Sequence, residues 1–210
     1  MANIITLTGA SHCGKSFVRQ LFIEASSKFW ADFKPIKFVK ETTRPTRKND
    51  DDVVHVNSIS PECDFVYEQY GVRYGFSLGD LYRHLKVGES PIIVVNDVRA
   101  VEDLQTAAGD LVVSLFVYRR PPILKAFEDE ELTRMRDGYG KEEQEQALLS
   151  ARTRMEKAGA IHRIYIENIH LFNNVILNLT GEENKTRKQI ENIIAKLTKS
   201  IEGLVEVDNV

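Results

Sequence analysis

The 210-residue sequence has few cysteines, little net charge and no long hydrophobic run. Its two cysteines, Cys13 and Cys63, are too few for a disulfide scaffold, which predicts a reducing compartment. A formal net charge of -3 argues against an extensive basic surface for nucleic acid or anionic lipid. No apolar stretch reaches the length of a transmembrane helix, and the first residues do not form a signal peptide. We therefore expect a cytoplasmic protein, monomeric or homodimeric, with neither nucleic acid nor membrane as a partner.

Short apolar runs alternate with segments of helical periodicity along most of the chain. The runs predict four strands that are covered on both faces, at Ile4–Thr8 and at residues 91–95, 111–118 and 172–179. Helices are predicted at residues 16–27, 77–87, 101–107, 122–136, 142–157 and 182–201. This alternation is typical of an α/β protein in which helices cover both faces of a central parallel sheet, a three-layer sandwich.

Residues 34–76 interrupt the alternation. Short strands are predicted there at residues 36–42, 53–57, 65–70 and 72–76, without a helix among them, and we interpret the segment as a small antiparallel insertion. A polar, glycine-bearing stretch farther along predicts a helical lid at about residues 136–157. The chain is then one domain over residues 1–205, and its core is made of residues 1–33, 77–135 and 158–205.

Residues 9–16 follow the phosphate-binding pattern G-x-x-x-x-G-K-S. The pattern stands between an apolar run and a helical segment, where backbone N–H groups and the helix start together favour an anion. Lys15 is expected to reach the β- and γ-phosphates, and the Ser16 hydroxyl to bind Mg²⁺. The sequence therefore predicts a site for ATP and Mg²⁺. The candidate nucleotide-binding residues here are Gly9, Ser11, Cys13, Gly14, Lys15, Ser16 and Phe17.

The predicted insertion contains a second candidate anion site. Arg44 and Arg47 stand three residues apart in the run T-T-R-P-T-R, and Pro45 stiffens the chain after the first of them. Two guanidinium groups suit a dianionic phosphate, to which the Tyr74 hydroxyl would donate a further hydrogen bond. Arginines in a polar turn are usually only solvated. Beside a triphosphate site, however, a second anion site has a purpose, because phosphoryl transfer depends mainly on positioning the two phosphates.

Three other polar positions have open interpretations. Asp97 follows the strand at residues 91–95, at the sheet edge where ligands bind, and is predicted to hold Mg²⁺ through water or to contact the acceptor. Arg119 and Arg120 follow the next strand and either flank the ATP base or face water. The acidic run at residues 50–52 would bind a cation or form a solvated turn, and the solvated turn is favoured.

These motifs, in this order, resemble those of guanylate kinases. The resemblance rests on the loop at residues 9–16, the T-T-R-x-x-R run at residues 42–47 and the pair Tyr74-Gly75. It implies ATP- and Mg²⁺-dependent transfer of a phosphoryl group to GMP, giving GDP and ADP. The implied acceptor-binding residues are Arg44, Arg47, Tyr74, Ser77 and Asp97, and Asn178 is implied to lie near the ATP base. The implied catalytic residues are Lys15, Arg44 and two lid arginines, Arg136 and Arg152.

The chain departs from the guanylate-kinase pattern at the positions that read the base. Lys40 stands where a hydroxyl residue is expected, and Phe65 where a glutamate is expected. The segments at residues 71–75 and 95–100 are similar to those of ribose 1,5-bisphosphate phosphokinases, whose acceptor has a phosphate but no base. Arg47 favours GMP, so both acceptors stay open. A third interpretation, a non-catalytic guanylate-kinase-like binding module, is disfavoured by the intact phosphate loop.

Overall fold

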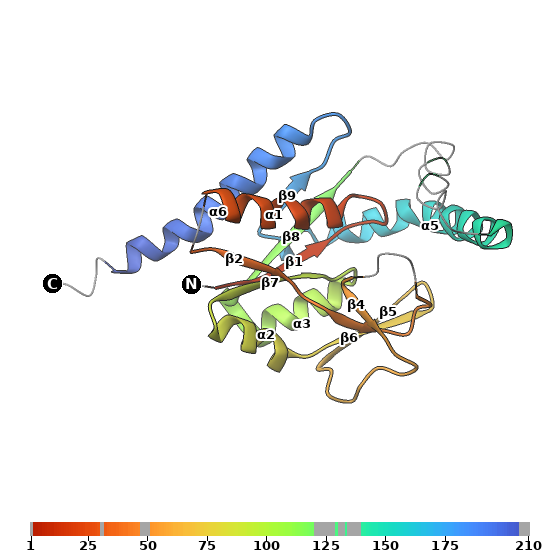
Figure 1. The fold of residues 1–210 in the computed structure, drawn as a ribbon, viewed down its shortest axis with the longest axis horizontal. Coiled ribbons are helices and arrows are strands. Elements are labelled where there is room, and N and C mark those ends of the chain that lie inside the picture. The colour runs from red at the N-terminus through yellow and green to blue at the C-terminus, as the bar shows by residue number, and fades with distance from the viewer. Residues whose placement is uncertain are drawn as a thin grey trace.

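A five-stranded parallel sheet forms the centre of the protein in the computed structural model (Figure 1). The structure describes residues 2–29, 32–46, 51–119 and 140–205, together with the single residues 129 and 133. The strand order is β2-β7-β1-β8-β9, and all four neighbouring pairs are parallel. The strands are β1 (Ile4–Thr8), β2 (Lys34–Lys37), β7 (Glu89–Val94), β8 (Val112–Tyr118) and β9 (Asn174–Leu177). The predicted central parallel sheet is confirmed.

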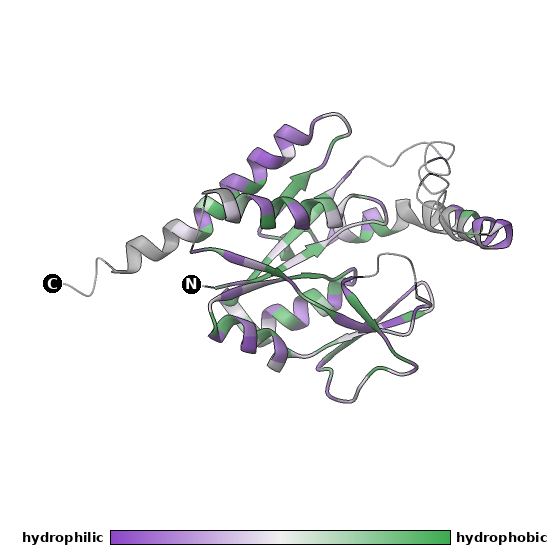
Figure 2. Ribbon diagram, in the orientation of Figure 1, coloured by the Kyte–Doolittle hydropathy of each residue, from purple (hydrophilic) through white to green (hydrophobic). Residues whose placement is uncertain are grey.

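Helices cover both faces of this sheet. On one face, α1 (Lys15–Phe29) and α6 (Glu183–Val205) pack through residues such as Phe22 and Ile190. On the other face lie α2 (Leu78–Lys86), α3 (Val98–Ala108) and the carboxyl end of α5 (Lys141–Glu167). Two short 3₁₀ helices, η1 (Gly109–Leu111) and η2 (Ile169–Leu171), precede β8 and β9. Hydrophobic residues gather on the central strands and on the helix faces turned toward them (Figure 2), which gives the predicted three layers.

A second sheet packs against the α2–α3 side of the core. Its order is β4-β3-β6-β5, with β3 (Lys40–Thr42), β4 (Val53–His55), β5 (Phe65–Gln69) and β6 (Val72–Phe76). A tight turn joins β5 and β6, in which Tyr70 and Gly71 have positive φ angles of 56° and 74°. Phe65 and Phe76 of this sheet share one hydrophobic cluster with the core strands and helices. The second sheet is therefore fixed to the first one by a common core.

The segment at residues 34–76 differs from its prediction in two ways. The single strand expected at residues 36–42 is divided: β2 pairs with β7 in the central sheet, whereas β3 belongs to the second sheet. The turning point is Phe38, whose ring is buried in the shared core. The second sheet is also mixed, because β3 pairs with β4 in parallel and with β6 antiparallel. The first four residues of the expected insertion thus complete the core sheet.

One long helix, α5, runs through the boundary that the sequence placed between lid and core. It has 27 residues and continues ten residues beyond the helix predicted at 142–157. Apart from residues 129 and 133, the helix predicted at 122–136 lies outside the described residues, as does most of the glycine-bearing stretch before α5. Within the described part of the chain, no helix combines the length and the apolar character needed to cross a bilayer.

Candidate functional site

The phosphate-binding pattern lies between β1 and α1, as the sequence predicts. His12 and Gly14 have positive φ angles of 63° and 89°. The Cys13 N–H donates to the Ala10 carbonyl at 3.3 Å, and the Val18 N–H donates to the Gly14 carbonyl at 2.9 Å. The chain therefore turns sharply just before the helix starts. This is the backbone geometry in which successive N–H groups cradle an anion.

Two glycines of the loop are required by close contacts. A Cβ atom on Gly9 would lie 2.5 Å from the Val117 carbonyl oxygen and 2.6 Å from the Cys13 sulfur. A Cβ atom on Gly14 would lie 2.1 Å from Nδ2 of Asn178, at a φ angle that also disfavours a side chain. The two glycines are therefore needed because β8 and the residue after β9 pack closely against the loop.

Lys15 folds over its own loop. Its ammonium donates to the Gly9 carbonyl at 2.9 Å and to the Ala10 carbonyl at 2.8 Å. Ser16 and Phe17 follow it at the helix start, and both are exposed. The Lys15 ammonium thus lies against the loop backbone, next to the exposed Ser16 at the start of α1.

Two side chains from outside the loop support its backbone. Nδ2 of Asn178, just after β9, donates to the Cys13 carbonyl at 2.8 Å. The Arg119 guanidinium donates to the His12 carbonyl at 3.2 Å and to the Thr180 hydroxyl at 3.2 Å. Arg119 was predicted to flank the ATP base or to face water; its guanidinium supports the loop backbone, and a contact with the base stays a prediction. Arg120 lies outside the described residues.

The second predicted anion site is anchored by the two threonines before Arg44. The Thr42 hydroxyl donates to the Arg73 carbonyl at 3.2 Å and accepts from the Arg44 N–H at 3.2 Å. The Thr43 hydroxyl accepts from the Arg73 N–H at 3.0 Å. Nδ1 of His55 donates to the Arg44 carbonyl at 2.8 Å. The T-T-R run is therefore fixed to β4 and β6 on both sides, which holds the Arg44 backbone at the end of β3.

Tyr74 is part of an aromatic platform that contains a buried lysine. Its ring stacks on Tyr67 at 5.3 Å, with an angle of 18° between the planes. The Lys40 ammonium lies 4.8 Å from the centre of the Tyr74 ring and donates to the Tyr67 hydroxyl at 2.7 Å. We use the term tyrosine platform for Lys40, Tyr67 and Tyr74. The sequence marked Lys40 only as a departure from the guanylate-kinase pattern. Its burial was not expected, because lysine is rarely buried.

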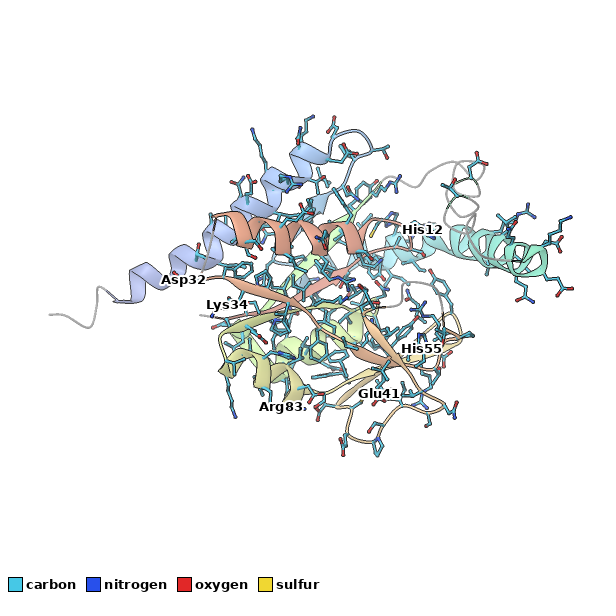
Figure 3. All side chains as sticks on the ribbon, in the orientation of Figure 1. His12, Asp32, Lys34, Glu41, His55 and Arg83 are labelled. Atoms are coloured by element: carbon cyan, nitrogen blue, oxygen red, sulfur yellow. The ribbon has the colours of Figure 1, made fainter. Side chains whose placement is uncertain are left out.

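The two candidate anion sites converge on Lys40. Burial lowers the pKa of Lys40 to about 7, Asp52 raises it, and the positive charges of Lys15 and Arg44 lower it further. Lys15 belongs to the phosphate loop and Arg44 to the second sheet, so both cations act on one ammonium group. In Figure 3, His12 marks the phosphate loop and His55 marks the second sheet beside Arg44, and both labels lie toward the end from which α5 projects.

Two predicted acceptor residues begin helices. The Ser77 hydroxyl accepts from the Asp80 N–H at the start of α2, and the Asp97 carboxylate accepts from the Ala100 N–H at the start of α3. Asp97 follows β7 at the predicted sheet edge, and its charge contributes to raising the pKa of Tyr67, for which burial is the main cause. Their contacts with an acceptor stay predictions.

For the three remaining predicted arginines, a place at this edge stays a prediction. Arg47 and Arg136 lie outside the described residues, and Arg152 is exposed on α5. The acidic run was predicted to be a solvated turn, and the Asp51 side chain is indeed 63% exposed, although it pairs with Lys37. Asp52 is less exposed and pairs with the buried Arg19 at 2.9 Å. Among the described residues, no group of three or more His, Cys, Asp or Glu side chains is arranged to hold a metal ion.

Comparison with solved structures gives a clear result for the fold. The crystal structure of guanylate kinase from Anaplasma phagocytophilum matches with a TM-score of 0.57, covering 93% of this chain and 85% of that chain. The fold is guanylate-kinase-like. The two sequences are only 21% identical, so the likeness concerns the fold alone. The chain matches no protein-family model, and no curated protein matches its sequence.

Proposed function

We propose that this guanylate-kinase-like chain is an ATP- and Mg²⁺-dependent phosphotransferase whose acceptor group is itself a phosphate. The observation that carries the proposal is the closeness of the two candidate anion sites: Lys40 lies against Tyr74 of the second sheet and donates to the carbonyl of Val94, which pairs with Leu7 just before the phosphate loop. A donor phosphate and an acceptor phosphate need two cationic sites that face each other. A binding module would need only one of them.

The phosphate loop fits ATP by its own geometry. Gly9 and Gly14 leave no room for side chains where β8 and β9 approach, and the Lys15 ammonium lies against the loop backbone. The exposed Ser16 hydroxyl would hold Mg²⁺ together with the ATP phosphates, which suits an ion that keeps several waters and needs no carboxylate cluster. The metal would neutralise charge on the phosphate oxygens.

The chain's own residues would act mainly by positioning. The loop amides and Lys15 would stabilise negative charge on the β- and γ-phosphates, and Arg44 and Tyr74 would hold the acceptor phosphate. No general base is needed, because a phosphate oxygen is already a nucleophile near neutral pH. Arg47, Arg136 and Arg152 are proposed to complete the cationic surroundings of the transferring group.

GMP is the first candidate acceptor, since the fold and the two-arginine clamp follow guanylate kinases. One observation favours ribose 1,5-bisphosphate as a second candidate. Phe65 stands where a base-reading glutamate is expected, and it is buried against Phe76 at 4.9 Å. The neighbouring Asp64 carboxylate accepts from the Leu78 N–H at the start of α2. Neither residue is therefore placed to read guanine, whereas an acceptor without a base needs no such group.

A coupled assay of ADP release tests the proposal with GMP and ribose 1,5-bisphosphate side by side. The expected result is ADP release that requires Mg²⁺ and one of the two acceptors. A Lys15→Met variant, which removes the ammonium but keeps the apolar stem, should lose this activity. If the wild-type chain binds ATP and Mg²⁺ but releases no ADP with either acceptor, the phosphotransferase assignment is wrong for these acceptors. If it binds no ATP at all, the result supports the non-catalytic binding module.

A further inference from the structure

Lys40 is a buried cation in the second sheet. Its side chain stands in β3, and the residue is only 6% exposed. The ammonium donates to the Tyr67 hydroxyl of β5 and to the Val94 carbonyl at the end of β7. The Tyr67 hydroxyl in turn donates to the same Val94 carbonyl at 3.3 Å. Lys40 thus joins the second sheet to the carboxyl edge of the central sheet.

The charges around Lys40 are mostly of its own sign. Lys15 and Arg19 approach from α1, and Arg44 follows β3, while Asp52, just before β4, is the acidic group that acts on it. Asp52 is itself paired with Arg19. Among the described residues, no carboxylate forms an ion pair with the Lys40 ammonium. Tyr67 and Tyr74 present their hydroxyl groups and ring faces to it instead.

A buried cation among other cations is costly unless an anion joins them. Holding β3 against β7 does not need this charge, because a hydrophobic side chain of similar length would fill the same space. The tyrosine platform lies beside Arg44, the predicted clamp for the acceptor phosphate. The local charge surplus is therefore what a bound phosphate would neutralise.

We propose that Lys40 is a positioning residue of the acceptor site, which fixes the Tyr67–Tyr74 pair and adds a buried positive charge that favours a phosphate-bearing acceptor. This inference rests on the proposed function. Lys40 acts through Tyr74: its charge below the ring makes the phenol a stronger donor toward phosphate oxygens. It sets affinity for the acceptor and leaves the ATP site to Lys15.

The low pKa of Lys40 gives the proposal a signature that a merely structural role lacks. With a pKa of about 7, the free protein loses this charge as the pH rises through neutrality. The groups that set this transition are Asp52, Lys15, Arg44 and Arg19, with Tyr67 and Tyr74 in direct contact. The acceptor's KM should therefore rise with pH above about 7. The second pKa of the acceptor phosphate, near 6, has the opposite effect, because the phosphate becomes more negative as the pH rises.

The test is steady-state kinetics with GMP and ribose 1,5-bisphosphate between pH 6.5 and 8.5, using wild type, Lys40→Met and Lys40→Arg. We expect Lys40→Met to raise the acceptor's KM about tenfold at pH 6.5, the scale of one charge-assisted contact, with the KM for ATP unchanged. The difference from wild type should shrink toward pH 8.5. Arginine stays charged over this pH range, so the acceptor's KM of Lys40→Arg should rise less with pH than that of wild type. Lys86→Met, at an exposed position on α2, is the matched control.

Three results would overturn the proposal. One is a Lys40→Met effect of equal size at both pH values, and another is a parallel rise in the KM values of acceptor and ATP. The third is a wild-type and a Lys40→Arg profile that rise alike. If Lys40→Met fails to fold, the comparison of Lys40→Arg with wild type still decides. Absence of any turnover by wild type would instead contradict the proposed function, and this inference with it.

Discussion

The side-chain amide of Asn178 donates to the carbonyl of Cys13 at 2.8 Å, joining two positions 165 residues apart in the chain. Asn178 follows the edge strand β9, and Cys13 stands in the phosphate loop. The bond is buried, so its loss leaves a carbonyl of the loop without this donor. We expect Asn178→Ala to raise the KM for ATP about tenfold, with less effect on the acceptor.

Asn173 provides a matched control for this prediction. Its side chain also bonds to backbone near the β8–β9 pair, accepting from the Ser114 N–H at 2.7 Å, but far from the loop. Asn173→Ala should lower the melting temperature without changing the affinity for ATP, measured by calorimetry. Equal loss of ATP affinity in both variants would contradict a specific role of Asn178 in the loop.

The second prediction concerns stability and pH. The pKa of Lys40 falls from an ordinary 10.5 to about 7 in the folded protein. Between these values the unfolded chain binds the extra proton, so this group makes the folded state more stable as the pH rises from about 7 to 10.5. Below pH 7 the buried charge is present in full and costs the most.

Lys40→Met should therefore stabilise the chain relative to wild type most at pH 6 and least near pH 10. Each pH unit within that window changes the difference by up to about 1.4 kcal/mol. Urea unfolding at pH 6, 8 and 10 measures it, with Lys86→Met as the exposed control. A constant difference across the three pH values would show that Lys40 has an ordinary pKa. The expected gain in stability is the reverse of the expected loss in acceptor affinity.

The third prediction concerns the link between α1 and the second sheet. Arg19 is buried on α1, and its guanidinium pairs with Asp52 just before β4 at 2.9 Å. Asp52→Asn leaves this buried cation with a weaker partner and should lower the free energy of unfolding by about 1–3 kcal/mol. It should also lower the pKa of Lys40 further, since the Asp52 charge raises it.

Asp51 is the neighbouring control. Its side chain is 63% exposed, and its contact with Arg19 is longer, at 3.5 Å. Asp51→Asn should cost less than about 1 kcal/mol, as for exposed ion pairs. Chemical denaturation of both variants at neutral pH gives the comparison. The interpretation of Asp52 as the link fails if the two substitutions cost the same.

The fourth prediction concerns the acceptor clamp. Arg44 is held at the end of β3 by bonds to Thr42 and His55. Arg44→Ala should raise the acceptor's KM and lower kcat by at least tenfold, with little change in ATP affinity, because only the acceptor's position is lost. Arg44→Lys keeps the charge and should recover only part of the lost activity, because lysine cannot form the two parallel hydrogen bonds of arginine to a phosphate.

The control for Arg44 is Arg73→Ala. Arg73 is an exposed arginine on β6, and its hydrogen bonds with Thr42 and Thr43 are made by its backbone carbonyl and N–H. Its side chain should therefore be dispensable for turnover. Kinetics with varied acceptor at fixed ATP distinguish the two variants. An Arg44→Ala enzyme that matches the wild type would remove Arg44 from the acceptor site.

The sequence predicts the central part of this fold well because the signals there are local. The apolar run at β1, the glycine loop and the amphipathic α1 follow each other within 29 residues. The division between β2 and β3 leaves no such signal. Pro35 is the buried residue of β2, whereas Phe38, Lys40 and Thr42 are buried farther on, so burial changes from odd to even positions as the pairing partner changes from β7 to β6. The residue types do not mark this change, because Lys40 is buried and Val39 is exposed.

The candidate site is predicted in part for the same reason. The phosphate loop and the T-T-R run are continuous motifs, whereas Lys40, Arg119 and Asn178 acquire their contacts from distant strands. Lysine is almost always exposed, so no composition rule predicts a buried Lys40. Ser77 did have a local signal for its capping role, because the pattern S-x-x-D with Asp80 is typical of a helix start.

The continuity of α5 gives it the properties of a lever arm. Tyr165 fixes its inner end, where the residue is 2% exposed and its hydroxyl donates to the Asn96 carbonyl at 2.9 Å, next to Asp97. Arg152 stands about 20 Å farther along the same rigid rod, at 1.5 Å per residue. A rotation of α5 by roughly 10° about Tyr165 would move Arg152 by about 3.5 Å. A small displacement of the helix beside Asp97 therefore becomes a larger one at Arg152.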